Sequence, residues 1–165
     1  MNYAQIRQFD IANGEGIRTT LFVSGCTFNC KGCFNKKYQD FNYGTQFTDE
    51  IQNKIINYLK FDYVSGLSIL GGEPFMQDKN LLDFIIRVKT TLENKTIWVW
   101  SGFTFEEILQ DTRKRELLKH IDVLVDGQFV EELKDLTLKF KGSSNQRIID
   151  VQKSLQQGSV VLWEN

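Results

Sequence analysis

Three cysteines, Cys26, Cys30 and Cys33, lie within eight residues of one another, and the chain has no other cysteine. An odd number of thiols excludes a disulfide framework, because one thiol would always stay unpaired. Thiols at spacings of four and three residues can instead surround one metal centre. A Gly or Asn precedes each cysteine, and both residue types favour tight turns. The segment therefore predicts a loop wrapped around a metal centre.

The number of ligands indicates which metal. A structural zinc site takes four protein ligands, and the only histidine, His120, lies far along the chain at the expected end of a helix. Three thiolates without a near fourth ligand suit a [4Fe–4S] cluster that leaves one iron open to an outside ligand. Zinc binding and accidental clustering of the cysteines remain the alternatives.

Composition restricts the class of protein. With 165 residues, 41% of them hydrophobic, the chain is long enough to bury a core as one domain over residues 1–165. The last fifteen or so residues are expected to be a tail or a terminal strand. The 20 basic and 21 acidic residues nearly cancel, which argues against a nucleic-acid partner held by phosphate charge. No apolar run approaches the roughly 18 residues of a membrane helix, and no secretory signal precedes the cysteines, so we expect a cytoplasmic protein without a membrane partner.

Strand and helix patterns alternate along the chain. Apolar, β-branched runs predict four strands, at 17–24, 66–70, 96–100 and 121–125. Helical spacings follow N-cap residues at Thr48, at Asp78 or Asn80, and at Thr104. Weaker runs at 147–151 and 159–163 can add strands. This alternation predicts an α/β fold with a parallel sheet and right-handed crossovers.

Four to six strand–helix units are too few for a closed barrel of eight. We therefore expect an incomplete, open (β/α) barrel or a curved sheet. Ligands of such folds bind at the carboxyl ends of the strands. The cysteine loop, Gly71-Gly72-Glu73-Pro74, Ser101-Gly102 and Asp126-Gly127 each follow one of the four strands. These loops are predicted to form one site.

The cysteine spacing and the Gly-Gly-Glu loop together resemble the radical S-adenosylmethionine (SAM) superfamily. Further segments resemble one family within it, the activating proteins of anaerobic ribonucleoside-triphosphate reductase. The segments that carry the resemblance are NGEGIRTTLFVSGC, GCFN, LGGEP, IWVWSGF, DVLVDGQF and KGSSNQR. The resemblance extends from about residue 2 to about residue 150 and implies a fold of the radical SAM type.

This resemblance implies an oxidoreductase that activates a glycyl radical enzyme. A [4Fe–4S] cluster held by Cys26, Cys30 and Cys33 would cleave SAM reductively into methionine and a 5′-deoxyadenosyl radical. That radical would take a hydrogen atom from the glycine loop of the reductase large subunit. A reduced flavodoxin-like protein would donate the electron. The cofactors carry the chemistry, so no catalytic side chain is expected.

The resemblance also implies residues that bind SAM. Gly71, Gly72 and Glu73 match the loop that receives the methionine end of SAM. Glycines let the backbone approach a ligand closely, and a carboxylate suits the SAM ammonium group. The family more often has Asp at the position of Glu73. A plain turn between a strand and a helix is the alternative for this loop.

Two further groups complete the predicted SAM site. Gly32, Cys33 and Phe34 would contact the adenine by backbone and ring together, with Phe34 as an ordinary core residue the alternative. Ser101 and Asp126 end predicted strands, where they would hydrogen-bond the ribose. Capping of the following loops is the alternative for Ser101 and Asp126.

The function has alternatives as well. The polar segment Gly142–Arg147 is either a solvated turn or a lip that touches SAM or the reductase. Activation of another glycyl radical enzyme is one alternative function. A non-enzymatic iron–sulfur electron-transfer module is another, although a fully ligated cluster would require a fourth cysteine.

Overall fold

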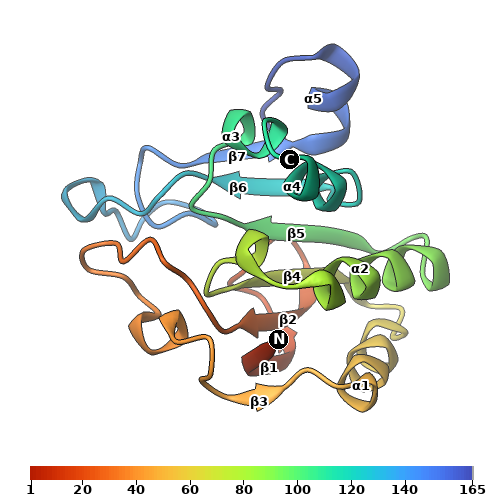
Figure 1. The fold of residues 1–165 in the computed structure, drawn as a ribbon. Coiled ribbons are helices and arrows are strands. Elements are labelled where there is room, and N and C mark those ends of the chain that lie inside the picture. The colour runs from red at the N-terminus through yellow and green to blue at the C-terminus, as the bar shows by residue number, and fades with distance from the viewer. Residues whose placement is uncertain (165) are drawn as a thin grey trace.

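The computed structural model describes residues 1–164, whose strands form one sheet of seven in the order β3-β1-β2-β4-β5-β6-β7 (Figure 1). The strands are β1 (Asn2–Asp10), β2 (Ile17–Val23), β3 (Thr45–Gln46), β4 (Val64–Gly71), β5 (Thr96–Trp100), β6 (Val123–Asp126) and β7 (Arg147–Asp150). The α-helices are α1 (Asp49–Leu59), α2 (Lys79–Thr91), α3 (Phe105–Leu109), α4 (Thr112–Leu118) and α5 (Val151–Gln157). Short 3-10 helices are η1 (Lys36–Gln39), η2 (Pro74–Met76) and η3 (Glu131–Leu133).

The four strands at the centre of the sheet are parallel, as the sequence predicts. β2 pairs with β4, β4 with β5, and β5 with β6. On either side the pairing is antiparallel, through β1 and β3 at one edge and β7 at the other. The sheet is therefore open and parallel at its centre, and nothing in its pairing closes it into a barrel.

The sequence did not predict β1 and β3. β1 reads NYAQIRQFD, a strand with many polar residues and mostly half-buried side chains, so it lacks an apolar run. β7 lies within the predicted run 147–151. The run 159–163 was wrong as a strand, because among its residues only Leu162 makes an isolated bridge, to Ile149.

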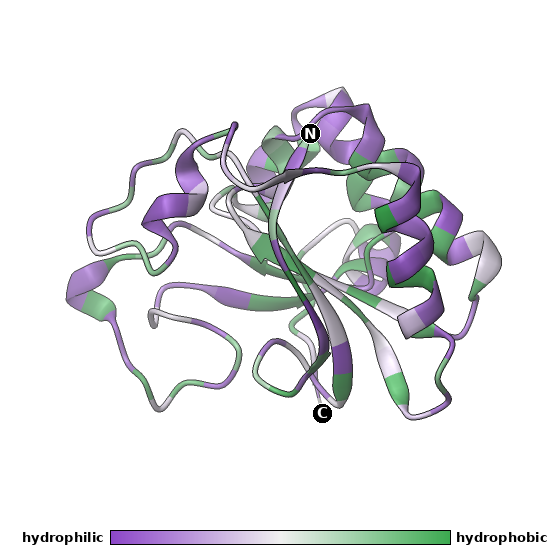
Figure 2. Cartoon of the chain, turned by 90° about the horizontal axis from the view of Figure 1, so that it is seen from below, coloured by the Kyte–Doolittle hydropathy of each residue, from purple (hydrophilic) through white to green (hydrophobic). Residues whose placement is uncertain are grey.

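Helices α1 to α4 cover one face of the sheet (Figure 2). Their apolar side chains pack with alternate residues of the central strands, such as Leu21, Leu67 and Val99, in one buried cluster. Because side chains alternate across a strand, the intervening residues, including Phe22, Leu70 and Trp100, lie on the other face. That second face is free of α1 to α4. Phe140 and Trp163 pack over part of it, on Trp98, Val123 and Val125, and another part of it lines a cavity.

The predicted helix caps are confirmed. The Thr48 hydroxyl accepts the Ile51 N–H, and the Asp78 carboxylate accepts the Asn80 N–H. Thr104 and Glu107 form the predicted capping box at the start of α3. These caps fix where each helix begins after its loop. None of the helices between residues 1 and 164 has the length and apolar character needed to cross a bilayer.

A buried cation ties the central strands together. Arg18, on β2, is 1% exposed. Its guanidinium donates hydrogen bonds of 2.7 Å to Ser68 Oγ on β4 and 2.8 Å to the Thr96 carbonyl on β5. Burial lowers the pKa of Arg18 to about 10. Arg18 thus links three strands on the side of the sheet that faces away from the helices.

Candidate functional site

The loops that follow the parallel strands surround one cavity of about 580 Å³. Most of the site residues predicted from the sequence line it, namely Cys26, Cys30, Cys33, Phe34, Gly71, Gly72, Glu73 and Ser101. Gly32 and Asp126 are not among the residues that line the cavity. The loops thus line one cavity at the carboxyl ends of the strands, and the role of each predicted site residue stays a prediction.

The cysteine loop owes its shape to the residue before each cysteine. Gly25, Asn29 and Gly32 have φ angles of +112°, +52° and +74°, in the left-handed region. Glycine and asparagine adopt this region at little cost. A Cβ at Gly25 would also lie 2.1 Å from the Phe41 ring. The turn chemistry expected of this loop is thus present at all three cysteines.

The donor set of the cavity is three free thiols. Each cysteine is partly exposed, and burial raises the pKa of the Cys26 and Cys30 thiols. Among the described residues, no three Cys, His, Asp or Glu side chains are placed to hold a single metal ion. Soft thiolate ligands favour iron–sulfur clusters, and in a four-iron cluster each thiolate binds a different iron atom. The donors present therefore fit a [4Fe–4S] cluster.

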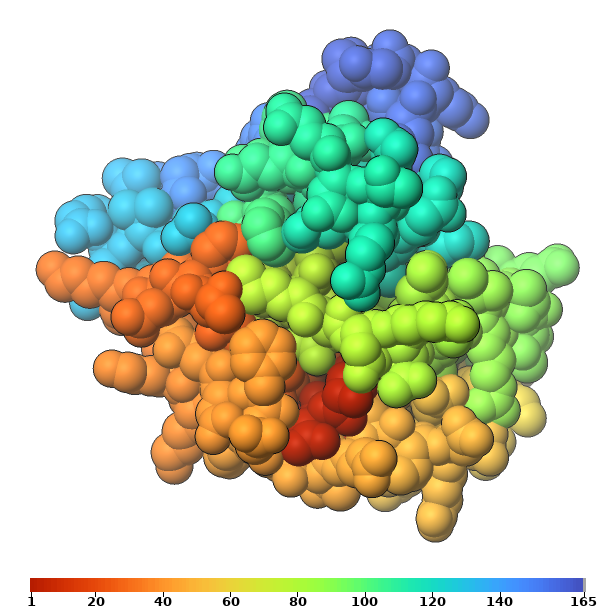
Figure 3. Space-filling view, in the orientation of Figure 1, coloured from red at the N-terminus to blue at the C-terminus, as the bar shows by residue number. Residues whose placement is uncertain are grey.

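The Gly-Gly-Glu loop is joined to the cysteine loop by backbone hydrogen bonds. The Gly72 N–H donates to the Val23 carbonyl at 2.7 Å, and the Glu73 N–H donates to the Gly25 carbonyl at 2.8 Å. A Cβ at Gly72 would lie 2.6 Å from the Gly25 carbonyl oxygen. Figure 3 shows the two segments side by side, the cysteine loop in orange and the segment after β4 in yellow-green. Glycine at position 72 is thus required by the close approach of the two loops.

The Glu73 carboxylate is 2% exposed and holds two loops together. Its Oε1 accepts hydrogen bonds from the Phe75 N–H at 3.0 Å and the Ser101 hydroxyl at 2.8 Å. Its Oε2 accepts the Gly102 N–H at 2.7 Å. Burial raises the pKa of Glu73 to about 7. Glu73 and Ser101 thus engage each other, and their direct contacts with SAM stay predictions.

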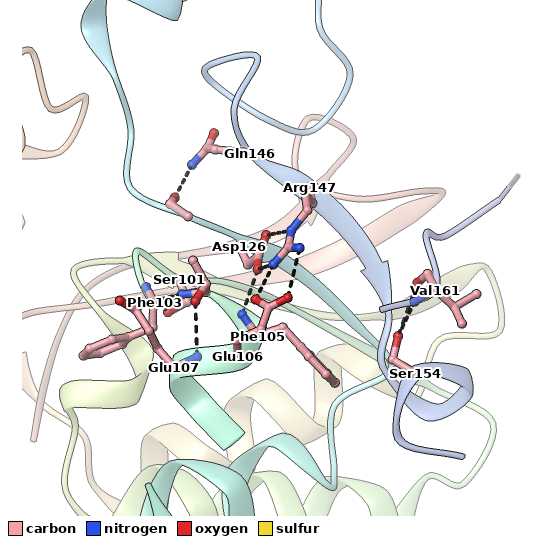
Figure 4. A network of polar contacts seen from close by, with 12 residues as sticks. Ser101, Phe103, Phe105, Glu106, Glu107, Asp126, Gln146, Arg147, Ser154 and Val161 are labelled. Atoms are coloured by element: carbon pink, nitrogen blue, oxygen red, sulfur yellow. Dashed lines mark hydrogen bonds and ion pairs between the residues drawn. The ribbon is translucent and has the colours of Figure 1, made fainter. Parts of the chain in front are cut away.

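Asp126 is 1% exposed and pairs with an arginine that the sequence did not indicate (Figure 4). Its two carboxylate oxygens accept hydrogen bonds from Arg147 Nε at 3.0 Å and Arg147 Nη2 at 2.6 Å. Oδ2 also accepts the Phe105 N–H at the start of α3. This contact is to the helix that follows β5, whereas the alternative weighed for Asp126 was capping of the loop after Asp126 itself. The predicted ribose contact stays a prediction. Arg147 also pairs with Glu106, and these hydrogen bonds raise the pKa of Arg147.

Phe34 lines the cavity and is 56% exposed, which excludes the alternative of an ordinary core residue. Its ring centroid lies 4.8 Å from that of Phe129. The Lys134 ammonium lies 5.2 Å from the same ring. Gly32 lies just before this wall of the cavity, and a Cβ there would come within 2.9 Å of the Glu131 side chain. Of the three residues predicted to contact adenine, Cys33 and Phe34 line the cavity, and the contact itself stays a prediction.

The segment between β6 and β7, here called the 127–146 loop, forms another wall of the cavity. Gln146 organises its base (Figure 4). The Gln146 side chain accepts the N–H groups of Gly142 and Ser143 and donates to the Gly127 carbonyl at 2.9 Å. Asn145 donates to the Gln128 carbonyl at 2.8 Å. Within the Gly142–Arg147 segment, Gly142 and Gln146 line the cavity, whereas Ser144 and Asn145 form an exposed turn. The contact of this segment with SAM or the reductase stays a prediction.

Comparison with known proteins identifies the family. A family described as a 4Fe-4S single cluster domain matches residues 12–149. The chain is 45% identical to the anaerobic ribonucleoside-triphosphate reductase-activating protein of Haemophilus influenzae, over 90% of this chain and 97% of that protein. The proteins of the same name from Escherichia coli K12 and Enterobacteria phage T4 are 41% and 36% identical, over 88% and 90% of this chain and 96% and 93% of their own lengths. With three free thiols beside a Gly-Gly-Glu loop and this level of identity, the chain belongs to the family of anaerobic ribonucleoside-triphosphate reductase-activating proteins.

Proposed function

We propose that this protein is a radical SAM enzyme that generates a glycyl radical on the large subunit of an anaerobic ribonucleoside-triphosphate reductase. The observation that carries the proposal is that Cys26, Cys30, Cys33 and the Gly71–Glu73 loop line one cavity. The relatives from Haemophilus influenzae and Escherichia coli K12 are activators of this reductase by name, which supports the choice of target.

The three cysteines would hold the [4Fe–4S] cluster as thiolates. The positive φ angles of the residues that precede them turn the loop around one volume. When bound, the reduced cluster would supply the electron for reductive cleavage of SAM, and the radical chemistry that follows would act on a glycine of the reductase. Three thiolates would leave one iron of the cluster without a protein ligand. The amino and carboxylate groups of SAM would bind at that iron.

The loops after β4 and β5 would hold the methionine end of SAM. Gly71 has a φ of +104°, and Gly71 and Gly72 expose backbone to the cavity next to the cysteine loop. Glu73 lies behind them and fixes the loop through Ser101 and Gly102. Backbone carbonyls can accept the SAM ammonium, while the partly protonated Glu73 keeps the two strand ends at a fixed separation.

Aromatic and aliphatic side chains would cover the adenosyl end. The cavity has apolar lining residues in Phe34, Phe129, Leu138 and Phe140. Such a lining excludes water from a reactive radical and so suppresses its side reactions. The planar, aromatic ring of Phe34 can stack on adenine.

We also propose the setting in which this site works. The open sheet with helices on one face supports an incomplete (β/α) barrel of the radical SAM type, formed by residues 1–165 as one domain. A reduced flavodoxin-like protein is the proposed electron donor. The cytoplasm is the proposed location, because its reducing conditions keep thiols available for a cluster.

The proposal is tested by reconstituting the protein with iron and sulfide under anaerobic conditions, reducing it and adding SAM. Equal amounts of methionine and 5′-deoxyadenosine are expected, and a glycine-centred radical is expected by electron paramagnetic resonance once the reductase is added. Cys30→Ala should abolish both products. Thr27→Ala, in the same loop but without a thiol, is the matched control. Retained 5′-deoxyadenosine formation by Cys30→Ala would defeat the ligand assignment.

A further inference from the structure

The chain beyond α5 turns back and packs beside β7. Gly158 ends α5 with a φ of +73°. The Val161 N–H then donates to Ser154 Oγ at 2.8 Å (Figure 4). The Val161 carbonyl accepts the Asp150 N–H at 2.9 Å. The Trp163 N–H donates to the Ile148 carbonyl at 2.9 Å. The segment 158–164 is therefore fixed against the edge of the sheet, and it lies beyond the residues that the iron–sulfur family matches.

This packing places Trp163 in a group of aromatic rings on the face of the sheet that α1 to α4 leave open. The ring centroid of Trp163 lies 4.9 Å from that of Trp98, with the rings at 73°. Phe140, from the 127–146 loop, lies 5.3 Å from Trp98 and 6.5 Å from Trp163. Edge-to-face contacts at these distances are favourable. Trp98 and Trp163 together thus hold the Phe140 ring.

Phe140 has a backbone conformation that it would not adopt alone. Its φ is +62°, and bulky residues with a side chain at Cβ rarely occupy this region. Trp100 Nε1 donates a hydrogen bond of 2.6 Å to the Phe140 carbonyl. Such a conformation persists only where surrounding contacts impose it. Here the contacts are that hydrogen bond and the two tryptophan rings.

The backbone at Phe140 determines where the next residues of the cavity wall lie. Phe140, Lys141 and Gly142 all line the cavity. Gly142 approaches the Phe34 and Phe129 rings so closely that a Cβ there would lie 2.9 Å from Phe34. Loss of the left-handed turn at Phe140 would therefore move Gly142 away from the ring proposed to stack on adenine.

We propose that Phe140 and Trp163 are positioning residues. They hold the 127–146 loop against the cavity and so determine how tightly the cavity binds SAM. The proposal rests on the proposed function, because it takes SAM as the ligand of the cavity. It assigns to the C-terminal segment a role in ligand binding although no residue of that segment is among those that line the cavity. Neither residue reacts. Trp163 acts through Phe140, whose own ring lines the cavity, and through the position of Gly142.

Trp163→Ala tests the proposal, with Leu162→Ala as its matched control. Leu162 makes a backbone bridge beside Trp163, but its side chain is 58% exposed. After reconstitution, the Trp163→Ala protein should bind SAM about tenfold more weakly than the unchanged protein, and its iron content should be unchanged. The Leu162→Ala protein should bind SAM as tightly as the unchanged protein. Trp163→Phe, which keeps a ring, should restore most of the affinity. SAM binding by Trp163→Ala equal to that of the unchanged protein would overturn the proposal.

A second readout does not depend on SAM. Trypsin should cleave the reconstituted Trp163→Ala protein faster after Lys134 and Lys139, which lie in the 127–146 loop, but not after Lys60 or Lys89. Equal acceleration at all four sites would indicate general destabilisation and defeat the positioning role. If the Trp163→Ala protein does not fold, Phe140→Gly replaces it, because glycine accepts a positive φ without strain but lacks the ring. Phe140→Gly should show the same faster cleavage after Lys134 and Lys139 only. If the unchanged protein failed to bind SAM, the proposed function would fall, while the cleavage pattern would still decide whether Trp163 holds the loop.

Discussion

The Ser101 hydroxyl donates a 2.8 Å hydrogen bond to Glu73 Oε1, and this contact joins the loop after β4 to the loop after β5. Ser101 Oγ in turn accepts the Phe103 N–H at 3.0 Å. The polar atoms of both side chains therefore maintain the cavity wall. Their effect on a ligand is expected to pass through the position of Gly71, Gly72 and Gly102, whose backbones line the cavity.

Glu73→Ala should destabilise the protein and weaken SAM binding while leaving the iron content near normal. The change removes the acceptor for the Phe75 N–H, the Gly102 N–H and the Ser101 hydroxyl. Unsatisfied buried donors cost about 1–3 kcal/mol each, so a loss of about 3 kcal/mol in the free energy of unfolding is expected. Urea denaturation measures it, and Glu93→Ala, at an exposed glutamate, is the control. Loss of iron from the Glu73→Ala protein would contradict this prediction and show that the cysteine loop depends on Glu73 for its structure.

The stability of the cluster-free protein should depend on the protonation of Glu73. Burial raises its pKa from 4.5 to about 7, so between these values the folded state binds more protons than the unfolded state. The free energy of unfolding should then fall as pH rises from 4.5 to about 7, by about 3 kcal/mol, and level off above. Urea titrations across this range should show the slope, and Glu73→Gln should flatten it. An equal slope in Glu73→Gln would assign it to another group.

Arg147 should matter to stability through Asp126 much more than through Glu106. The Asp126 carboxylate is buried, whereas the Glu106 side chain is 56% exposed. Asp126→Asn should therefore lower the free energy of unfolding by about 3 kcal/mol, because the partly buried guanidinium loses its buried charge partner and keeps only the exposed Glu106. Glu106→Gln should cost less than about 1 kcal/mol, as exposed ion pairs do. Thermal or urea unfolding compares the two. A fall in SAM affinity without a loss of stability in Asp126→Asn would instead support the ribose contact.

Local sequence signals predicted much of this molecule. The central parallel strands, the caps at Thr48, Asp78 and Thr104, and the turn before each cysteine depend on residues close in sequence. The position of the site followed from topology, since parallel strands end at one edge. These features were within reach because propensity and periodicity encode them directly.

The partners of the buried polar groups were not predictable in the same way. Asp126 and Arg147 are 21 residues apart, and Glu73 and Ser101 are 28 apart. In the sequence, a carboxylate at a strand end that faces a ligand cannot be distinguished from one that faces an arginine. Trp163 lies in a short run that resembles a strand, and only its contact with Trp98 reveals its place. Long-range pairing of this kind has no periodic signature in the sequence.

Gln146 and Asn145 should separate the part of the 127–146 loop that shapes the cavity from the part that faces outward. Gln146 lines the cavity and its amide binds three backbone groups of the loop. Asn145 is exposed and makes one such hydrogen bond, to the Gln128 carbonyl. Gln146→Ala should therefore reduce SAM cleavage and reductase activation together, by about tenfold.

Asn145→Ala should spare uncoupled SAM cleavage and lower reductase activation more, because its side chain is on the outer surface where a partner protein would meet the loop. The two rates are measured on the same preparations, as 5′-deoxyadenosine formed without reductase and as glycyl radical formed with it. Equal loss of both rates in Asn145→Ala would place this residue with Gln146 in shaping the cavity. Such a result would also remove the reason for assigning the outer surface of the 127–146 loop to the reductase.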